Sequence, residues 1–240
     1  MLVYGIHAVG EALKSRKVEK LIAVRGAGSK IAEMLDRARE LRVPVEIVDK
    51  MALERLTRGG VHQNIAAHLA ALPAYTIDEI LAVAHDAARA PLVVVLDGIE
   101  DPHNVGAIIR TADAAGVDGI IRQGRHAAPL SGAVAKASAG AVSRVRIATV
   151  VNIARALEDL KEAGVWTVGL DGGATERYDQ IDYTIPTAFV FGAEGTGLRR
   201  LVGERCDRLV GIPMAGEAES LNVSVAAGIA LFEAVRQRMA

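Results

Sequence analysis

Residues 92–116 read LVVVLDGIEDPHNVGAIIRTADAAG, and this stretch decides the fold class. The run 92–99 is apolar and rich in valine, which is typical of a strand buried on both faces of a parallel sheet. Polar residues follow, and residues 104–116 then carry apolar side chains at helical spacing and end on glycine. A strand that leads through a polar loop into a helix is the repeating unit of α/β proteins.

The same alternation continues to the end of the chain. Further strands are predicted at 119–122, 145–150, 165–171, 187–192 and 207–214, and further helices at 131–141, 152–164 and 220–239. This order predicts a parallel sheet with helices on both faces. Because ligands of such sheets bind at the carboxyl ends of the strands, we expect the functional residues in the loops that follow them.

The first seventy residues predict a separate, smaller α/β unit. Its elements are a strand at 21–26, a helix at 30–42, a strand at 43–49, a helix at 51–57 and a closing strand at 61–70. Residues 71–90 contain one amphipathic helix and form a linker. We therefore expect domains at 1–70 and 91–240, joined by a linker at 71–90.

Composition excludes several classes of protein. Of the 240 residues, 51% are apolar, and Cys206 is the single cysteine, which excludes a disulfide framework and a thiolate zinc site. No apolar run resembles a signal peptide or a membrane span, so we expect a cytoplasmic protein with no membrane partner. Residues 1–70 hold twelve Lys and Arg against eight Asp and Glu, a net of +4, whereas the remainder has a net of −5. A basic unit joined to an acidic one weakly indicates nucleic-acid binding.

The first chemically unusual loop follows the strand at 92–99. It carries Asp97, Asp101, His103 and Asn104, and Arg110 lies in the next helix. Asparagine suits a helix N-cap, so capping is one explanation for Asn104. An arginine among small apolar helical residues usually meets a carboxylate or a phosphate.

The second loop belongs to FVFGAEGTGLRRL, residues 189–201. Glycines at 192, 195 and 197 surround Glu194, and such turns bring backbone amides close to a ligand. Their spacing is neither that of a dinucleotide-binding loop nor that of a P-loop.

The third loop belongs to residues 212–238, IPMAGEAESLNVSVAAGIALFEAVRQR. Its helix opens with Ser220, Asn222 and Ser224. Ser220 is a good N-cap, and Asn222 then falls inside the first turn, where capping alone does not explain it. No motif for a nucleophile or a metal site occurs in the chain.

Together the three segments resemble the three motifs of the SpoU family of RNA ribose 2′-O-methyltransferases, in the SPOUT superfamily. They stand in the family's order and span most of residues 92–238. The stretches YGIHAVGEAL (4–13) and GGVHQNIAA (59–67) look like the substrate-binding domain of one subgroup. That subgroup methylates a guanosine in the P-site loop of 23S ribosomal RNA.

The resemblance implies an α/β catalytic domain with a deep trefoil knot and an L30e-like amino-terminal domain that binds RNA. It also implies S-adenosyl-L-methionine as cofactor without a metal, and a homodimer with its active site at the dimer interface. Carried over residue by residue, the family's catalytic positions fall on Asn104, Arg110, Glu194, Ser220 and Asn222. The positions whose main chain holds the cofactor fall on Gly192, Ile212 and Leu221.

The family's suggested base is the arginine that matches Arg110. Arginine stays protonated in proteins, so either a substrate phosphate takes the hydroxyl proton or Arg110 orients the acceptor.

Three alternatives remain at this point. The first is a sister enzyme that methylates another ribosomal or transfer RNA ribose. The second is a non-catalytic RNA-binding protein of ribosome assembly, against which the complete motif set argues. The third is a dinucleotide oxidoreductase, which lacks its expected glycine motif.

Overall fold

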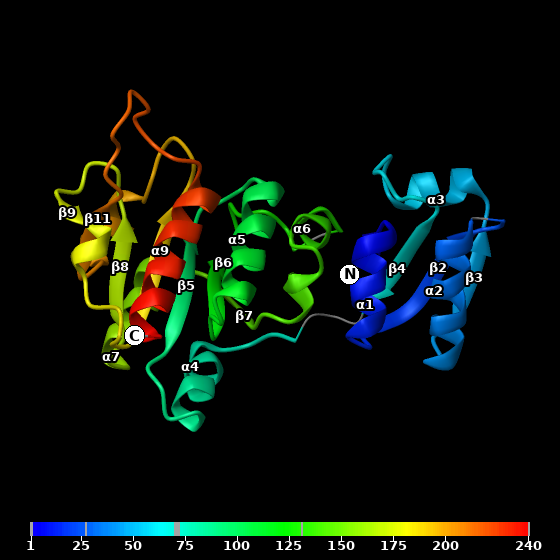
Figure 1. Ribbon diagram of the computed structural model, residues 1–240, viewed down its shortest axis with the longest axis horizontal. Helices are drawn as coiled ribbons and strands as arrows, with labels where there is room; N and C mark the ends of the chain where they lie inside the picture. The colour runs from blue at the N-terminus through cyan, green and yellow to red at the C-terminus, as the bar shows by residue number, and fades with distance from the viewer. Residues whose placement is uncertain (1, 27, 70–72, 131, 240) are drawn as a thin grey trace. The chain divides into compact units, whose positions relative to one another are not determined.

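The computed structural model describes residues 2–26, 28–69, 73–130 and 132–239. The chain divides into two compact units, each with its own sheet (Figure 1). The first unit comprises Met1–Leu72 together with Pro129–Arg144, and the second comprises Pro73–Ala128 together with Val145–Ala240. No helix in the described part of the chain has the length and hydropathy needed to cross a membrane.

The second unit is built on a seven-stranded sheet in which every pairing is parallel, as predicted. The strand order is β7-β6-β5-β10-β8-β11-β9. The strands are β5 (Leu92–Asp97), β6 (Gly119–Gln123), β7 (Ile147–Val150), β8 (Trp166–Leu170), β9 (Glu176–Arg177), β10 (Thr187–Gly192) and β11 (Arg208–Gly211). Of these strands the sequence pattern missed β9, because two residues show no periodicity, and it also missed the short helix α8 (Arg200–Arg205). The trefoil knot stays a prediction, since strand order alone does not define how the chain is threaded.

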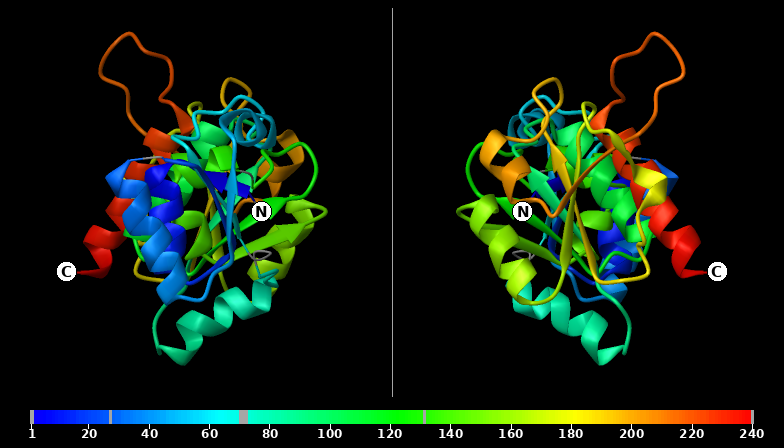
Figure 2. Two further views of the ribbon diagram at one scale, coloured as in Figure 1. Left: turned by 90° about the vertical axis from the view of Figure 1, so that its right-hand side faces the viewer. Right: turned by 90° about the vertical axis from the view of Figure 1, so that its left-hand side faces the viewer.

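Helices cover both faces of this sheet, and Figure 2 shows α7 and α9 on opposite sides of it. The helices are α4 (Ile77–Asp86), α5 (Pro102–Ala114), α7 (Ile153–Glu162), α8 (Arg200–Arg205) and α9 (Val223–Arg238). Side chains of α4, α7 and α8 pack in one core with Val93, Val95 and Val190. Because successive strand residues point to opposite faces, Phe189 and Phe191 face the other side, where α9 contacts β10 and packs against α5.

Both helix starts near the unusual loops differ from expectation. Helix α5 begins at Pro102, and the carboxylate of Asp101 caps it by accepting from the amides of His103 and Asn104. Capping as the explanation for Asn104 is therefore wrong, and its side chain is available for other contacts. At α9 the cap is Asn222, which accepts from the Ser224 amide, and not Ser220.

At the amino edge of the second unit's sheet, Arg238, near the end of α9, binds the backbone before two strands. Its guanidinium donates to the carbonyl oxygens of Ala90, Pro91, Tyr183 and Ile185 at 2.7 to 3.0 Å. These carbonyls lie just before β5 and β10, so one side chain fixes the start of both central strands.

Two carboxylates, of which Asp118 is buried, act at the same edge. Asp118, directly before β6, accepts from the Leu92 amide and pairs with Arg89. Asp207, directly before β11, accepts from the amide and hydroxyl of Thr167 on the neighbouring strand β8. Each carboxylate therefore joins the beginnings of two adjacent strands.

The first unit has a four-stranded mixed sheet in the order β1-β4-β2-β3. Its strands are β1 (Leu2–Tyr4), β2 (Val18–Val24), β3 (Val45–Val48) and β4 (Ile65–Leu69). Its helices are α1 (Ile6–Lys14), α2 (Ser29–Glu40), α3 (Lys50–Leu56) and α6 (Gly132–Ala137). The predicted strand 61–70 corresponds to β4, and residue 70 lies outside the described residues.

Helix α6 comes from the middle of the chain but packs on β1 of the first unit. A Cβ at Gly132 would lie 2.7 Å from the Leu2 carbonyl oxygen, so only glycine permits this approach. The predicted helix 131–141 is thus α6 followed by a 3-10 turn at Ala141–Ser143, and residue 131 lies outside the described residues. Pro129–Arg144 belongs to the first unit's packing although its sequence continues the strand–helix alternation of the second.

Candidate functional site

Three side chains, one from each unusual loop, meet at the carboxyl edge of the seven-stranded sheet. The Asn104 amide nitrogen donates to a Glu194 carboxylate oxygen at 2.9 Å. The Asn222 amide nitrogen donates to the Asn104 side-chain oxygen at 2.9 Å and to the other Glu194 oxygen at 3.4 Å. We call Asn104, Glu194 and Asn222 the polar triangle. It joins segments that lie 90 and 118 residues apart in the chain.

Neighbouring bonds hold the polar triangle in place. Asn104 is 6% exposed, and both ends of its amide are used within the triangle. The Asn222 oxygen accepts from the amide of Ser224 at 2.9 Å and from its hydroxyl at 2.6 Å. Because buried amides with satisfied partners have one preferred orientation, the three loops are fixed relative to one another.

A cavity of about 330 Å³, here the first cavity, opens beside the polar triangle. It is lined by Leu170, Asp171, Gly172, Phe191, Gly192, Ala193, Glu194, Gly195, Thr196, Gly197, Leu198, Val210, Ile212, Met214, Glu219, Ser220, Leu221, Val223 and Ala226. Its lining comes from the carboxyl ends of β8, β10 and β11 and from the start of α9, as expected for a parallel sheet.

One wall of the first cavity depends on Gly192. The loop after β10 folds back on itself, and Ala193 and Gly197 exchange two backbone hydrogen bonds of 2.8 and 3.0 Å. A Cβ at Gly192 would lie 2.1 Å from the Gly197 carbonyl carbon, so no other residue fits there. Gly195 and Gly197 have φ values of +80° and +67°, which favour glycine.

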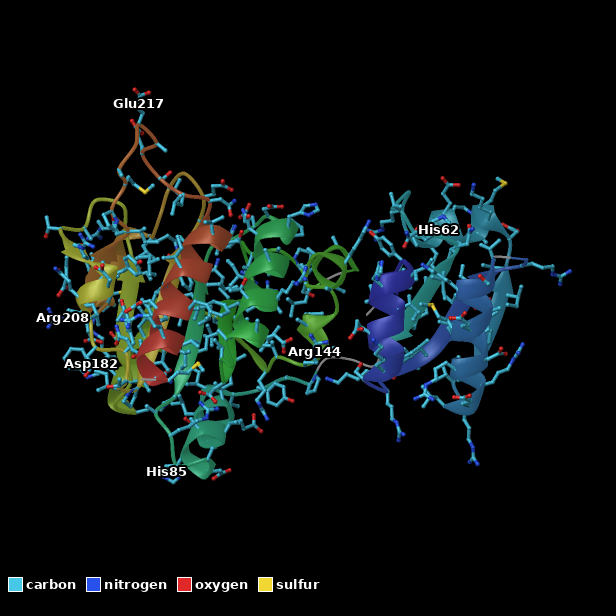
Figure 3. The ribbon with its side chains drawn as sticks, viewed as in Figure 1. His62, His85, Arg144, Asp182, Arg208 and Glu217 are labelled. Atoms are coloured by element: carbon cyan, nitrogen blue, oxygen red, sulfur yellow. The ribbon has the colours of Figure 1, made fainter. Side chains whose placement is uncertain are left out.

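The other wall comes from the two ends of the loop that joins β11 to α9. Ile212 and Leu221 line the cavity, whereas Glu217 marks the tip of the loop, which extends away from the sheet (Figure 3). The residues expected to hold the cofactor, Gly192, Ile212 and Leu221, thus surround one space.

The chemistry of this cavity suits S-adenosylmethionine. Phe191, Leu198 and Val210 provide an apolar surface for a flat base. Asp171 and Glu219 provide carboxylates for a ligand that carries positive charge. The volume also falls in the range of roughly 300 to 1,000 Å³ typical of small-molecule sites.

The expected catalytic residues are not all brought together within one chain. Asn104, Glu194 and Asn222 form the polar triangle, and Ser220 lines the first cavity but its side chain makes no hydrogen bond with any described residue. Arg110 is exposed on α5, borders neither this cavity nor the one described next, and pairs with no group among the described residues.

A second cavity of about 570 Å³ adjoins the first. It is lined by Asp97, Gly98, Ile99, Glu100, Asp101, Asn104, Gln123, His126, Ala193, Glu194, Thr196, Gly197 and Arg199. Four of these residues also line the first cavity: Ala193, Glu194, Thr196 and Gly197. The loop after β10 therefore separates two neighbouring cavities.

Sequence reasoning missed the network that supports the second cavity. The backbone amide of Arg199 donates to Asp97 at 2.9 Å, and its guanidinium Nε donates to the same carboxylate at 2.7 Å. The Arg199 Nη2 also donates to the Gln123 side-chain oxygen at 2.6 Å. The available signal was the opposite charge of Asp97 and Arg199 after two strands, β5 and β10, that are adjacent in the sheet.

Other reactive groups take no part in these cavities. Burial raises the pKa of the Cys206 thiol to about 12, so this cysteine is not a nucleophile at neutral pH. Within the described ranges, no group of His, Cys, Asp and Glu side chains is arranged to hold a metal ion.

Comparison with known proteins gives matches over nearly the whole chain. Residues 91–232 match the SpoU rRNA Methylase family, and residues 2–75 match the family described as RNA 2′-O ribose methyltransferase substrate binding. A 23S rRNA (guanosine-2′-O-)-methyltransferase RlmB from Vibrio cholerae is 44% identical over 245 residues, covering 100% of this chain and 98% of the relative. A protein named putative TrmH family tRNA/rRNA methyltransferase YacO, from Bacillus subtilis, is 41% identical over 98% of this chain and 95% of its own length.

Solved structures agree in fold. The SpoU methyltransferase AviRb from Streptomyces viridochromogenes, in complex with AdoMet, superposes with a TM-score of 0.85 and 30% identity. That match covers 100% of this chain and 91% of AviRb. An AdoMet-bound rRNA methyltransferase from Sinorhizobium meliloti gives a TM-score of 0.77 at 27% identity, covering 98% of this chain and 86% of that structure. On the family match over residues 91–232 and the full-length relatives, this chain belongs to the SpoU rRNA methylase family.

Proposed function

We propose that this protein transfers the methyl group of S-adenosylmethionine to the ribose 2′-hydroxyl of a guanosine in 23S ribosomal RNA, in the P-site loop. The observation that carries the proposal is the polar triangle of Asn104, Glu194 and Asn222, which fixes all three motif segments around the first cavity. The names of the full-length relatives supply the substrate class.

The first cavity would hold the cofactor, whose sulfonium supplies an activated methyl group when bound. The main chain at Gly192, Ile212 and Leu221 would hydrogen-bond its nucleoside, because these backbone segments border the cavity. The leaving thioether is neutral, so neither an oxyanion hole nor a metal ion is needed to stabilise it. The protein's tasks are to align the acceptor oxygen and to allow loss of its proton.

Arg110 would orient the acceptor ribose and its phosphate. A guanidinium stays protonated at neutral pH, so it binds the phosphate oxygens and leaves proton acceptance to that phosphate. Its exposed and unpaired state among the described residues suits a group that awaits an anionic substrate.

A homodimer would complete this arrangement. Arg110 borders neither cavity of its own chain, so a site that uses it needs a second copy to bring it there. Helix α9 supports this with large apolar side chains that its own chain leaves exposed: Val225, Phe232 and, at its end, Met239 are 50%, 49% and 82% exposed. Exposed apolar faces of this kind mark protein interfaces.

The first unit would bind the RNA. Its basic residues Arg16, Arg25, Lys30, Arg55 and Arg58 are exposed, as phosphate contacts require. Lys17 is half-buried, and burial followed by the nearby charge of Arg144 lowers its pKa. A ribosomal RNA substrate also supports action of this protein in the cytoplasm.

The test is transfer of a tritiated methyl group to 23S ribosomal RNA, followed by mapping of the labelled nucleotide. Label on a ribose of the P-site loop is expected. Label on transfer RNA or on another ribosomal ribose would favour a sister enzyme, which the name of the Bacillus relative keeps open. No incorporation with any RNA would favour a non-catalytic assembly protein.

A further inference from the structure

We propose that the second cavity holds the base of the target nucleotide, and that Glu100 and Arg199 select guanine by binding its two edges. The inference rests on the proposed function, since it assumes that a ribose is methylated beside the first cavity. It adds a base-binding site and two specificity-determining residues to that reaction.

Position is the first argument. The acceptor oxygen must lie within about 3 Å of the methyl carbon in the first cavity for transfer to occur. The base of the same nucleotide must then occupy space that borders that cavity. The second cavity does so, because the loop of Ala193, Glu194, Thr196 and Gly197 lines both.

The charge of the residues that line the second cavity favours a base over a phosphate as its ligand. The second cavity is lined by the carboxylates of Asp97, Glu100, Asp101 and Glu194 and by one guanidinium, that of Arg199. The charge of Arg199 is already matched by Asp97, with which it forms an ion pair. A phosphate would meet net negative charge here, whereas an uncharged base that offers N–H donors would not.

Unused hydrogen-bonding groups are the third argument. Glu100 makes no hydrogen bond or ion pair with any described residue. Arg199 uses Nε and Nη2 on Asp97 and Gln123, which leaves the Nη1 donors free within the described part of the chain. Asp97 is 1% exposed and Gln123 is 4% exposed, so this guanidinium is held by buried partners.

These free groups match guanine better than the other bases. Guanine presents two adjacent donors, N1–H and the 2-amino group, which one carboxylate accepts together. Adenine, cytosine and uracil each present a single donor beside an acceptor. Guanine's opposite edge presents O6 and N7, the acceptors that arginine most often binds in nucleic acids. His126, exposed at the cavity with a backbone φ of +51°, adds a ring on which the base can stack.

The experiment changes single atoms of the RNA and uses the full-length protein. Fragments of 23S ribosomal RNA carry guanosine, inosine or 7-deazaguanosine at the position that the wild-type enzyme methylates. Inosine lacks the 2-amino group, so wild-type kcat/KM should fall roughly 10-fold or more, as for the loss of one base contact. The variant Glu100→Gln should lose a similar factor on guanosine and barely distinguish guanosine from inosine.

Glu162→Gln is the matched control, because Glu162 is an exposed glutamate on α7 outside both cavities. It should keep the wild-type ratio of guanosine to inosine. S-adenosylmethionine affinity, measured by calorimetry, should be unchanged in both variants, and its loss in Glu100→Gln would overturn the assignment of Glu100 to the base.

The 7-deazaguanosine fragment tests Arg199 without disturbing its bonds to Asp97. A wild-type kcat/KM equal to that for guanosine would remove Arg199 from base recognition. If Glu100→Gln discriminates against inosine as strongly as wild type, the inference fails while the proposed function stands. If wild type methylates no guanosine of 23S ribosomal RNA, the proposed function itself fails.

Discussion

The two edges of the seven-stranded sheet use polar residues in opposite ways. At the amino edge, Arg238, Asp118 and Asp207 bind backbone groups at the starts of neighbouring strands. At the carboxyl edge, polar side chains bind one another, as in the polar triangle, and border two cavities. The same kinds of residue thus stabilise the sheet at one edge and leave space for ligands at the other.

Substitutions at the two edges should therefore have different effects. A side chain that binds fixed carbonyls contributes to folding whether or not a ligand is present. A side chain that positions a loop around a ligand site contributes mainly to ligand binding and to the rate of reaction. The two edges should therefore separate in experiments that measure both rate and stability.

Replacement of Arg110 by alanine should have the largest effect. We expect kcat to fall roughly 1,000-fold, the loss typical when a group that stabilises the reacting centre is removed. Cofactor affinity and the unfolding midpoint should stay at wild-type values, because Arg110 is exposed and borders neither cavity. A methyl-transfer assay, calorimetry and urea unfolding measure these quantities.

The exposed arginine of α7, replaced as Arg155→Ala, is the control for that experiment. Retained turnover in Arg110→Ala, or lost cofactor binding, would contradict the role given to Arg110.

Asn104→Ala should be next in size. It removes the central member of the polar triangle, so Glu194 and Asn222 lose their common partner. We expect kcat/KM to fall roughly 100-fold, as for a small misplacement of reacting groups. The matched control is Asn152→Ala, which removes the N-cap of α7 outside both cavities.

That control should lower the free energy of unfolding by about 1 kcal/mol and leave the rate unchanged. Equal rates in the two asparagine variants would show that the polar triangle does not position the site.

At the opposite edge, Arg238→Met should lower stability and not rate. Four carbonyls lose a charged donor, so the free energy of unfolding should fall by about 3 kcal/mol. Arg236→Met, which loses the pair that the exposed Arg236 side chain makes with Glu233, should leave the free energy of unfolding close to its wild-type value. A large loss of kcat in Arg238→Met under conditions where it is folded would break the distinction between the edges.

The smallest effect is expected for Asp207→Asn, and it should depend on pH. Burial alone would raise the pKa of Asp207, but hydrogen bonds from Lys161 and Thr167 outweigh it and hold the pKa below its usual range. The folded-state pKa is therefore depressed, and the stabilisation is present above the unfolded pKa and lost as the pH falls through the folded one. Urea unfolding at pH 7 should show that the free energy of unfolding of the variant is lower than that of the wild type by about 1 kcal/mol.

Repeating that measurement at falling pH completes the test. The difference between variant and wild type should shrink below about pH 4. A difference that stays constant with pH would mean that the carboxylate charge of Asp207 does not stabilise the fold.

The sequence allowed prediction of the sheet but not of the contacts inside the site. Strand β10 was predicted at its observed bounds and β5 nearly so, because a buried parallel strand is a continuous apolar run. The caps suggested at Asn104 and Ser220 lie at Asp101 and Asn222 instead. All four residues are good caps, and local spacing does not choose between them.

Contacts such as Asn104 with Asn222 join residues far apart in the chain, and no local pattern encodes them. The parallel sheet predicted that these loops lie at one edge, and only the resemblance to a family singled out these side chains as one site. The ion pair of Arg199 with Asp97 was missed for the same reason.

The packing of Pro129–Arg144 with the first unit has a consequence for how the protein is made. On the ribosome, the amino-terminal unit cannot be completed when residue 72 emerges, because its last segment is encoded 57 to 72 positions later. At elongation speeds of about 5 to 20 residues per second that delay is roughly 3 to 14 seconds. During this interval the surface of β1 that later receives α6 is unfilled, while β5 and β6, two of the second unit's seven strands, are synthesised. The two units are therefore completed in an interleaved order during translation, and not one after the other.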